Sequence, residues 1–184
     1  MMKIEINYNN RTFTTSLNEP IDISIPLKNG DGNPNCFWAE PVVFETIRDG
    51  DFIGSVAEGG SVNYKKVIIT PHGNGTHTEC YGHISSDIEG VMTNSMSIFH
   101  FIAQLISLPL TVKPNGDAYI SFETFFEILN EKDQLPEAIV IRTLPNTDNK
   151  LNKRYSGNNP PYLDPKITEY LCKKNVNHLL IDLP

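Results

Sequence analysis

Residues 164–183 read DPKITEYLCKKNVNHLLIDL and give the clearest signal of the fold. Asp164 can cap the N-terminus of a helix, and Pro165 fits the first helical position, where its missing N–H would have no partner anyway. The apolar side chains that follow have helical spacing: Ile167, Tyr170 and Leu171. The stretch closes on an apolar run, residues 178–183, which is typical of a buried strand.

The segment upstream of this helix supplies a second strand. Residues 138–141 are a short apolar run, so the order is strand, helix, strand, which predicts a crossover between neighbouring parallel strands. The run 179–181 is typical of a strand in the middle of a parallel sheet, covered on both faces. A polar loop, residues 146–161, separates the first strand from the helix. We expect a loop of that length to be either disordered or functional.

A second helix is expected after Ser121, which can act as its N-cap. Four apolar side chains then line one helical face: Phe122, Phe125, Phe126 and Leu129. Residues 101–112 fit a helix face about as well as a buried strand. We favour the strand, because Pro109 and Pro114 would end a helix.

The first part of the chain indicates strands joined by turns. Residues 3–8 and 11–16 flank Asn9-Asn10 and predict a β-hairpin. Alternating or β-prone segments follow at residues 20–27, 41–48 and 66–70, and the glycines within 54–64 indicate a tight crossing of backbones. The length of 184 residues fits one domain. The sequence therefore predicts a single α/β domain over residues 1–184, with an N-terminal β-hairpin.

Composition and charge exclude several classes of protein. Fifteen basic and 22 acidic residues give a net charge of −7, which argues against binding to nucleic acid or to an anionic membrane. The longest apolar stretch, residues 98–110, is too short and too polar to span a bilayer. The N-terminus lacks the apolar core of a signal peptide, so we expect a cytoplasmic protein. Three widely spaced cysteines form neither a disulfide framework nor a CxxC metal knuckle.

The chemistry is concentrated in residues 71–83, PHGNGTHTECYGH, which hold three of the five histidines. His77 and Glu79 are two apart, so an extended backbone points both side chains the same way. Imidazole with carboxylate suits zinc or manganese. His72 lies across two glycines, where the backbone can turn and bring it back. His83 could be a ligand or a general acid/base. The alternative is that these histidines only cap and bridge backbone.

Other reactive or aromatic residues have weaker signals. Cys80 could be a nucleophile beside a histidine, but in an extended segment it alternates away from the pair described above, which favours a small buried thiol. Phe37 and Trp38 could wall an aromatic substrate pocket or belong to the core. Arg142 is expected to order a loop or pair with a carboxylate, and the histidines outside the loop are expected to be structural.

The run Asn74–His83, NGTHTECYGH, resembles the HxGTHxDxPxH signature of the cyclase family of metal-dependent hydrolases, which includes bacterial kynurenine formamidase. Three further segments resemble the same family. Residues 20–27 are similar to its early DLSHP segment, residues 137–143 to its central strand ending in Arg-Thr, and residues 159–184 to the helix and the strand ending in ID-x-P.

The resemblance implies a role for each residue of the loop. His77 and Glu79 would be metal ligands, with Glu79 in the place of an aspartate, and His83 would be the catalytic histidine with Glu79 beside it. The first ligand of the family falls on Gly73, with His72 one place early, so a local bulge must return His72 to the metal or that ligand is missing. The resemblance also implies a swivelling β/α/β fold with a mixed sheet, a homodimer, and zinc, or else manganese, as the cofactor.

The function implied by the resemblance is hydrolysis of a C–N bond in a small N-formyl or cyclic amide. The alternatives are a non-catalytic metal- or ligand-binding relative and a hydrolase that uses Cys80. The family continues past ID-x-P and brings a further histidine and glutamate to the metal. We therefore expect the cyclase-like domain 1–184 to lack its C-terminal part.

Overall fold

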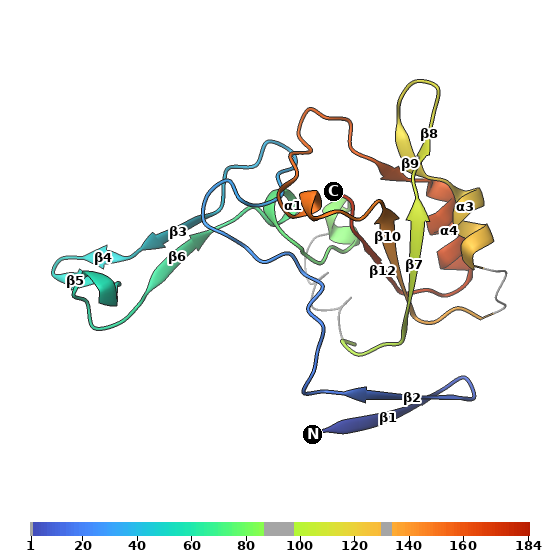
Figure 1. Ribbon diagram of the computed structural model, residues 1–184, viewed down its shortest axis with the longest axis horizontal. Coiled ribbons are helices and arrows are strands. Elements are labelled where there is room, and N and C mark those ends of the chain that lie inside the picture. The colour runs from blue at the N-terminus through green and yellow to red at the C-terminus, as the bar shows by residue number, and fades with distance from the viewer. Residues whose placement is uncertain (1, 87–97, 130–133) are drawn as a thin grey trace.

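Three parallel strands form the centre of the protein (Figure 1). The computed structural model of the chain describes residues 2–86, 98–129 and 134–184. Strand β10 (Ala138–Leu144) lies between β7 (Ala103–Pro109) and β12 (His178–Ile181), and both neighbours run parallel to it. Ala138 pairs with both Ala103 and His178, which fixes the register of the sheet. The predicted parallel crossover is therefore confirmed.

A second, smaller sheet extends from the first. It contains β8 (Thr111–Val112), β9 (Ala118–Ile120) and β11 (Tyr162–Leu163). The pair β8–β9 is antiparallel and the pair β9–β11 is parallel, so this sheet is mixed. Because β8 follows β7 almost without a break, residues 101–112 are extended, as the prolines predicted.

Both helices begin at the predicted caps. Ser121 Oγ accepts a hydrogen bond from the Thr124 N–H at 3.2 Å, and α3 follows (Phe122–Leu129). Asp164 Oδ1 accepts from the Lys166 N–H at 3.0 Å, and α4 follows (Pro165–Lys173). Each cap satisfies an amide that has no partner within its own helix.

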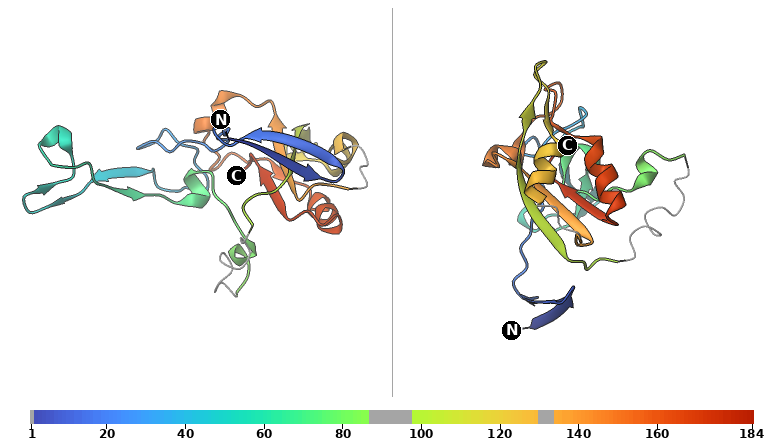
Figure 2. Two further views of the ribbon diagram at one scale, coloured as in Figure 1. Left: turned by 90° about the horizontal axis from the view of Figure 1, so that it is seen from below. Right: turned by 90° about the vertical axis from the view of Figure 1, so that its right-hand side faces the viewer.

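The hydrophobic core lies between the central sheet and these two helices, which occupy the same side of it (Figure 2). Phe125 and Leu129 of α3 are fully buried, and Ile167 and Leu171 of α4 join them. The strands supply the facing side chains: Ile106, Leu108, Ile139 and Ile141. The amphipathic pattern of both helices is thus explained by one shared layer.

Two antiparallel ribbons project from this body (Figure 1). One is the N-terminal hairpin of β1 (Lys3–Tyr8) and β2 (Arg11–Ser16), as predicted. The other pairs β3 (Val43–Thr46) with β6 (Lys65–Ile68). The remaining elements lie at its tip: β4 (Arg48–Asp49), β5 (Phe52–Ile53) and the 3-10 turn η1 (Val56–Glu58).

Glycines allow the backbones to cross near this tip. A Cβ on Gly54 would stand 2.4 Å from the Tyr64 carbonyl oxygen, and one on Gly60 would stand 1.9 Å from that of Ile53. The Tyr64 N–H donates to the Gly54 carbonyl across the crossing. The predicted close approach within residues 54–64 is confirmed.

Two expectations about strands are wrong. Residues 20–27 form no strand, and Ile21 and Ile23 are largely exposed, because no described strand lies beside them to accept the ladder bonds that alternation requires. Strand β12 is an edge strand among the described residues rather than a central one, and its side chains are only half-buried apart from the exposed Ile181.

None of the helices within residues 2–86, 98–129 and 134–184 has the length and apolarity that a bilayer crossing requires.

The core assignment predicts the effect of truncating Phe125. Phe125→Ala should lower the free energy of unfolding by about 3–5 kcal/mol, because it leaves a cavity between helices and sheet. The matched control is Ile128→Ala on the same helix, where the side chain is 42% exposed and the loss should stay below about 1 kcal/mol. Urea unfolding followed by circular dichroism measures both, and equal losses would contradict the packing described.

Candidate metal centre

The loop rich in histidine begins with a single helical turn, α1 (Pro71–Asn74). Thr70 is extended, and its carbonyl accepts the N–H groups of Gly73 and Asn74, both at 2.9 Å. The buried side chain of Asn74 returns a bond, because its Oδ1 accepts from the Thr70 N–H at 3.1 Å. Proline at the first position and this reciprocal pair make the turn form locally. The turn leaves His72 exposed on its outer side.

Gly73 is held against the segment that precedes the first ribbon. The Cys36 N–H donates to the Gly73 carbonyl at 2.9 Å, and a Cβ on Gly73 would stand 2.3 Å from Ala39 Cβ. No side chain fits there, so a histidine could not occupy position 73 in this backbone. The position one residue earlier carries the imidazole instead.

The middle of the loop is tied to residues 20–27. Thr76 Oγ1 accepts from the Ile25 N–H at 3.0 Å, and a Cβ on Gly75 would stand 3.1 Å from Leu27 Cδ2. His77 Nδ1 contacts the Gly75 carbonyl oxygen at 2.9 Å, and no hydrogen bond from the described residues engages Nε2 of that ring. These contacts fix the direction of the extended segment that carries His77 and Glu79.

Glu79 lies at the centre of the cluster. Its Oε1 is 2.5 Å from His72 Nε2 and 2.8 Å from His83 Nδ1. The turn η2 (Tyr81–His83) returns the chain towards α1. The ring of His83 stacks on that of His72, with centroids 4.8 Å apart. The rings of His72 and His77 are 5.0 Å apart. All four residues predicted from the sequence therefore lie together.

The donor set suits a divalent cation. Ligand atoms of His72, His77 and Glu79 all lie within 4.8 Å of one another. Two imidazole nitrogens and a carboxylate oxygen are the ligands that zinc and manganese accept. Two ligands of a tetrahedral zinc ion stand roughly 3.3 Å apart, each about 2.0–2.1 Å from the metal. The contact between His72 and Glu79 must therefore open by somewhat less than 1 Å to admit the ion.

The cluster faces solvent. The side chains of His72, Glu79 and His83 are 48%, 41% and 53% exposed. An exposed three-ligand arrangement leaves coordination positions for water or substrate, as catalytic zinc sites do and closed structural sites do not. The same exposure means that the surrounding protein excludes little water from the cluster in this chain.

The remaining candidates from the sequence lie elsewhere or play other parts. Cys80 is half-buried, and no described contact joins its sulfur to an imidazole. His178 stacks on Phe101 with centroids 4.2 Å apart, which agrees with a structural role. Arg142 is exposed, and its Nε donates to Ser107 Oγ at 2.9 Å.

Phe37 and Trp38 are both largely exposed, beside the segment that packs on Gly73. Both adopt positive φ, 55° and 52°, which is unfavourable for large side chains. The Trp38 N–H donates a hydrogen bond to Ser156 Oγ at 2.9 Å, which helps to hold both residues in this backbone conformation. They are not core residues, and whether they wall a substrate pocket remains a prediction.

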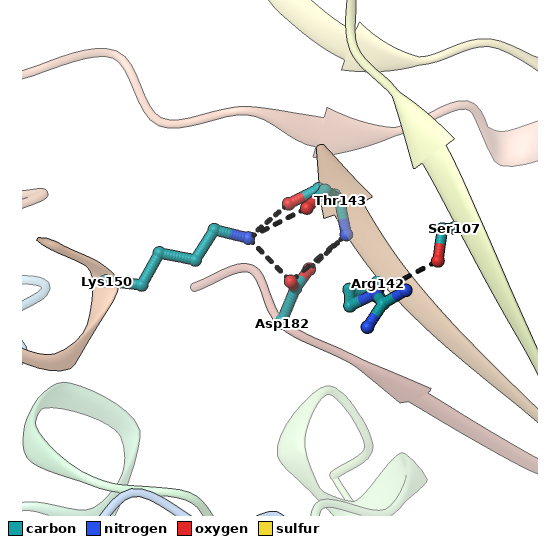
Figure 3. Close-up of polar contacts among 5 residues, drawn as sticks. All are labelled: Ser107, Arg142, Thr143, Lys150 and Asp182. Carbon is teal, nitrogen blue, oxygen red and sulfur yellow. Dashed lines mark hydrogen bonds and ion pairs between the residues drawn. The ribbon is translucent and has the colours of Figure 1, made fainter. Parts of the chain in front are cut away.

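Sequence reasoning missed a polar cluster at the carboxyl end of β10 (Figure 3). Asp182 accepts from the Thr143 N–H at 3.0 and 3.1 Å, and Lys150 Nζ donates to both Asp182 and Thr143 Oγ1 at 2.5 Å. Lys150 belongs to the turn η3 (Asp148–Asn152) in the long polar loop. The length of that loop was the only signal, because no spacing in the sequence pairs these three residues.

A family model described as "Putative cyclase" matches residues 21–184. The chain belongs to this cyclase family. The match includes the whole histidine-rich loop and the strand–helix–strand unit, and it leaves the N-terminal hairpin outside. Comparison with curated proteins and with solved structures finds no match. Membership of the cyclase family is consistent with an enzyme that uses a metal, and the cluster of His72, His77 and Glu79 is where the described residues could hold one.

The packing of Gly73 predicts a selective effect of adding one methyl group. Gly73→Ala should lower the free energy of unfolding by about 1–3 kcal/mol, because Ala39 must move and α1 with it. Gly32→Ala is the control, since its Cβ would stand 3.5 Å from Lys28 Cδ, an ordinary contact. Urea unfolding and zinc content after dialysis measure the two variants. A Gly73→Ala protein that matches the control in both would contradict the tight packing.

Proposed function

We propose that this protein is a metal-dependent hydrolase of a C–N bond in a small N-formyl or cyclic amide, similar to kynurenine formamidase. The observation that supports this most is the convergence of His72, His77 and Glu79, with ligand atoms within 4.8 Å, in a chain of the cyclase family. The donor set favours zinc, with manganese as the second candidate. A bound ion of this kind polarises a carbonyl and lowers the pKa of a coordinated water to about 7.

His72 and His77 can each present one ring nitrogen to the cation. His72 Nε2 already points at Glu79, and His77 has Nε2 free because its Nδ1 faces the Gly75 carbonyl. Glu79 Oε1 faces both His72 and His83, so Oε2 can hold the ion while Oε1 remains on His83. Hydrogen bonds of this kind engage the ring nitrogen or carboxylate oxygen that does not bind the ion. They orient the ligands and fix the tautomer of a ligating histidine.

His83 is the residue that we assign to proton transfer. Its Nδ1 lies 2.8 Å from Glu79 Oε1, so a protonated Nδ1 would donate a hydrogen bond to the carboxylate. That tautomer leaves Nε2 as the basic nitrogen, which can accept a proton from water and pass it to the leaving amine. The side chain is half-exposed, so substrate can reach it.

We also propose a homodimer, a cytoplasmic location and a swivelling β/α/β arrangement, all from the family resemblance. The two projecting ribbons support the dimer. An isolated two-stranded hairpin is marginally stable in water. The ribbon of β3 and β6, with the segment that leads into β6, nevertheless exposes apolar side chains: Val43, Val62, Tyr64, Val67 and Ile68. A second copy covering this ribbon would stabilise it.

A second candidate function is metal or ligand binding without turnover. Position 73, where the resemblance places the first ligand, has no room for a side chain, and the cluster is open to water. Loose coordination of this kind gives poor control of the near-attack geometry that hydrolysis requires. Metal content measured together with turnover separates the two functions.

The ligand assignment predicts that His77→Ala loses the metal. Removing one imidazole from a three-ligand site removes much of the binding free energy, while the core does not depend on this exposed side chain. We expect zinc content after dialysis to fall from about one ion per chain to near zero, with unchanged circular dichroism. His72→Ala should behave similarly, and His100→Ala, at an exposed histidine outside the loop, is the control. Full zinc content in His77→Ala would show that His77 is not a ligand.

The role of His83 predicts a different result for its replacement. His83→Ala should keep the metal and lower turnover of N-formylkynurenine by roughly 10²–10⁴-fold, the usual effect of removing a positioned acid or base. Elemental analysis and a steady-state assay on the zinc-loaded protein measure the two effects. Loss of the metal would instead make His83 a ligand, and unchanged turnover would exclude it from proton transfer. Metal retention without turnover in the parent protein would favour the binding function.

A further inference from the structure

A pocket of about 440 Å³ opens at the carboxyl end of β10, where Thr143 and Lys150 line it. Both residues belong to the polar cluster drawn in Figure 3. Its volume falls within the roughly 300–1,000 Å³ of ordinary small-molecule sites. Parallel sheets commonly bind ligands at this edge, beyond the carboxyl ends of the strands. We propose that the pocket binds a small organic anion with an apolar body, and that Lys153 recognises the charge of that ligand.

The wall of the pocket is mainly apolar. Leu110, Leu144 and Leu183 face it, together with two prolines of the surrounding loops. Burial raises the pKa of Tyr155, which also lines the pocket, so its hydroxyl stays neutral and can donate a hydrogen bond. Such a wall favours a hydrocarbon or aromatic body over a hydrated inorganic ion.

Lys150 lines the same pocket but has no donor to spare. Its ammonium donates to Asp182 Oδ2 and to Thr143 Oγ1, both at 2.5 Å, and to the Thr143 carbonyl at 3.4 Å. These bonds use all three N–H groups, and Asp182 balances the charge. Lys150 therefore clamps the loop onto the end of the strand and forms a fixed part of the pocket.

Among the described residues that line the pocket, Lys153 is the cation whose ammonium makes no hydrogen bond to another described residue. This ammonium lies 5.1 Å from the centroid of the Tyr155 ring. Its backbone is held on both sides, because the Asn35 N–H donates to the Lys153 carbonyl and the Tyr155 N–H donates to the Asn35 carbonyl. A cation with unused donors on a fixed backbone, beside an apolar wall, suits a carboxylate on an apolar body.

The pocket is distinct from the metal centre. None of the metal-cluster side chains is among the described residues that line it. The two sites are nevertheless joined by backbone, since Asn35 holds the pocket wall and the adjacent Cys36 holds Gly73. The proposal does not depend on the metal or on hydrolysis, so it can be tested on metal-free protein.

Three probes separate the charge of the ligand from its apolar body. Benzoate has both, benzamide has the body without the charge, and acetate has the charge with almost no body. We expect benzoate to bind at least about fivefold more tightly than either, a difference that corresponds to a partly exposed ion pair. Titrations of the metal-free 184-residue chain, followed by amide chemical shifts, should place the changes at Leu144, Lys150 and Lys153.

Substitution of the proposed recognition residue completes the test. Lys153→Gln should remove the preference for benzoate over benzamide, while Lys153→Arg should keep it. Lys166→Gln, at a lysine on α4 outside the pocket, is the matched control and should bind as the parent does. Equal binding of benzoate and benzamide, an unchanged preference in Lys153→Gln, or shifts confined to the histidine-rich loop would each overturn the proposal.

Discussion

The Cys36 N–H donates to the Gly73 carbonyl, and the arrangement of both candidate sites depends on the close approach that this bond marks. The segment Asn35–Ala39 touches α1 on one side and residues 153–156 on the other. One side of it therefore positions the turn that carries His72, and the other side positions the wall that carries Lys153. Glycine at position 73 is what lets two backbones come close enough for this.

The central sheet provides the fixed frame behind these loops. β10 is hydrogen-bonded on both edges and packed against α3 and α4, so its carboxyl end is a rigid attachment point. The pairing of β10 with β12 ends at Ile181, and the next residue, Asp182, accepts a hydrogen bond from the Thr143 N–H through its side chain. Lys150 then neutralises that carboxylate, which would be costly to leave half-buried without a partner. These side-chain bonds thus take the place of the backbone hydrogen bond that would follow the last β10–β12 pair.

The histidine-rich loop differs from this frame in its energetics. Its side chains are about half-exposed, so their mutual contacts contribute little to folding. The backbone bonds of α1 and the anchor between Thr76 and Ile25 hold the loop in place instead. The donor atoms converge because the backbone is fixed, and exposure keeps them accessible to a cation and a substrate.

Local patterns in the sequence determined much of this protein. Both helix caps and the N-terminal hairpin depend on residues close together in the chain, and the order strand, helix, strand predicts a parallel pair, so these features were predictable. The convergence of His72, His77, Glu79 and His83 was also predictable, because all four lie within twelve residues. Alternation in residues 20–27 misled, since a strand forms only where another strand is available to pair with it.

Only the tertiary structure decided the contacts between distant segments. Nothing in the chain pairs Lys150 with Asp182, or Asn35 with Lys153, until the sheet brings them together. The lack of room for a side chain at position 73 follows from the packing of Ala39, a neighbour more than thirty residues away in the sequence. Long-range packing of this kind depends on shape and volume, which a linear pattern of residue types does not encode.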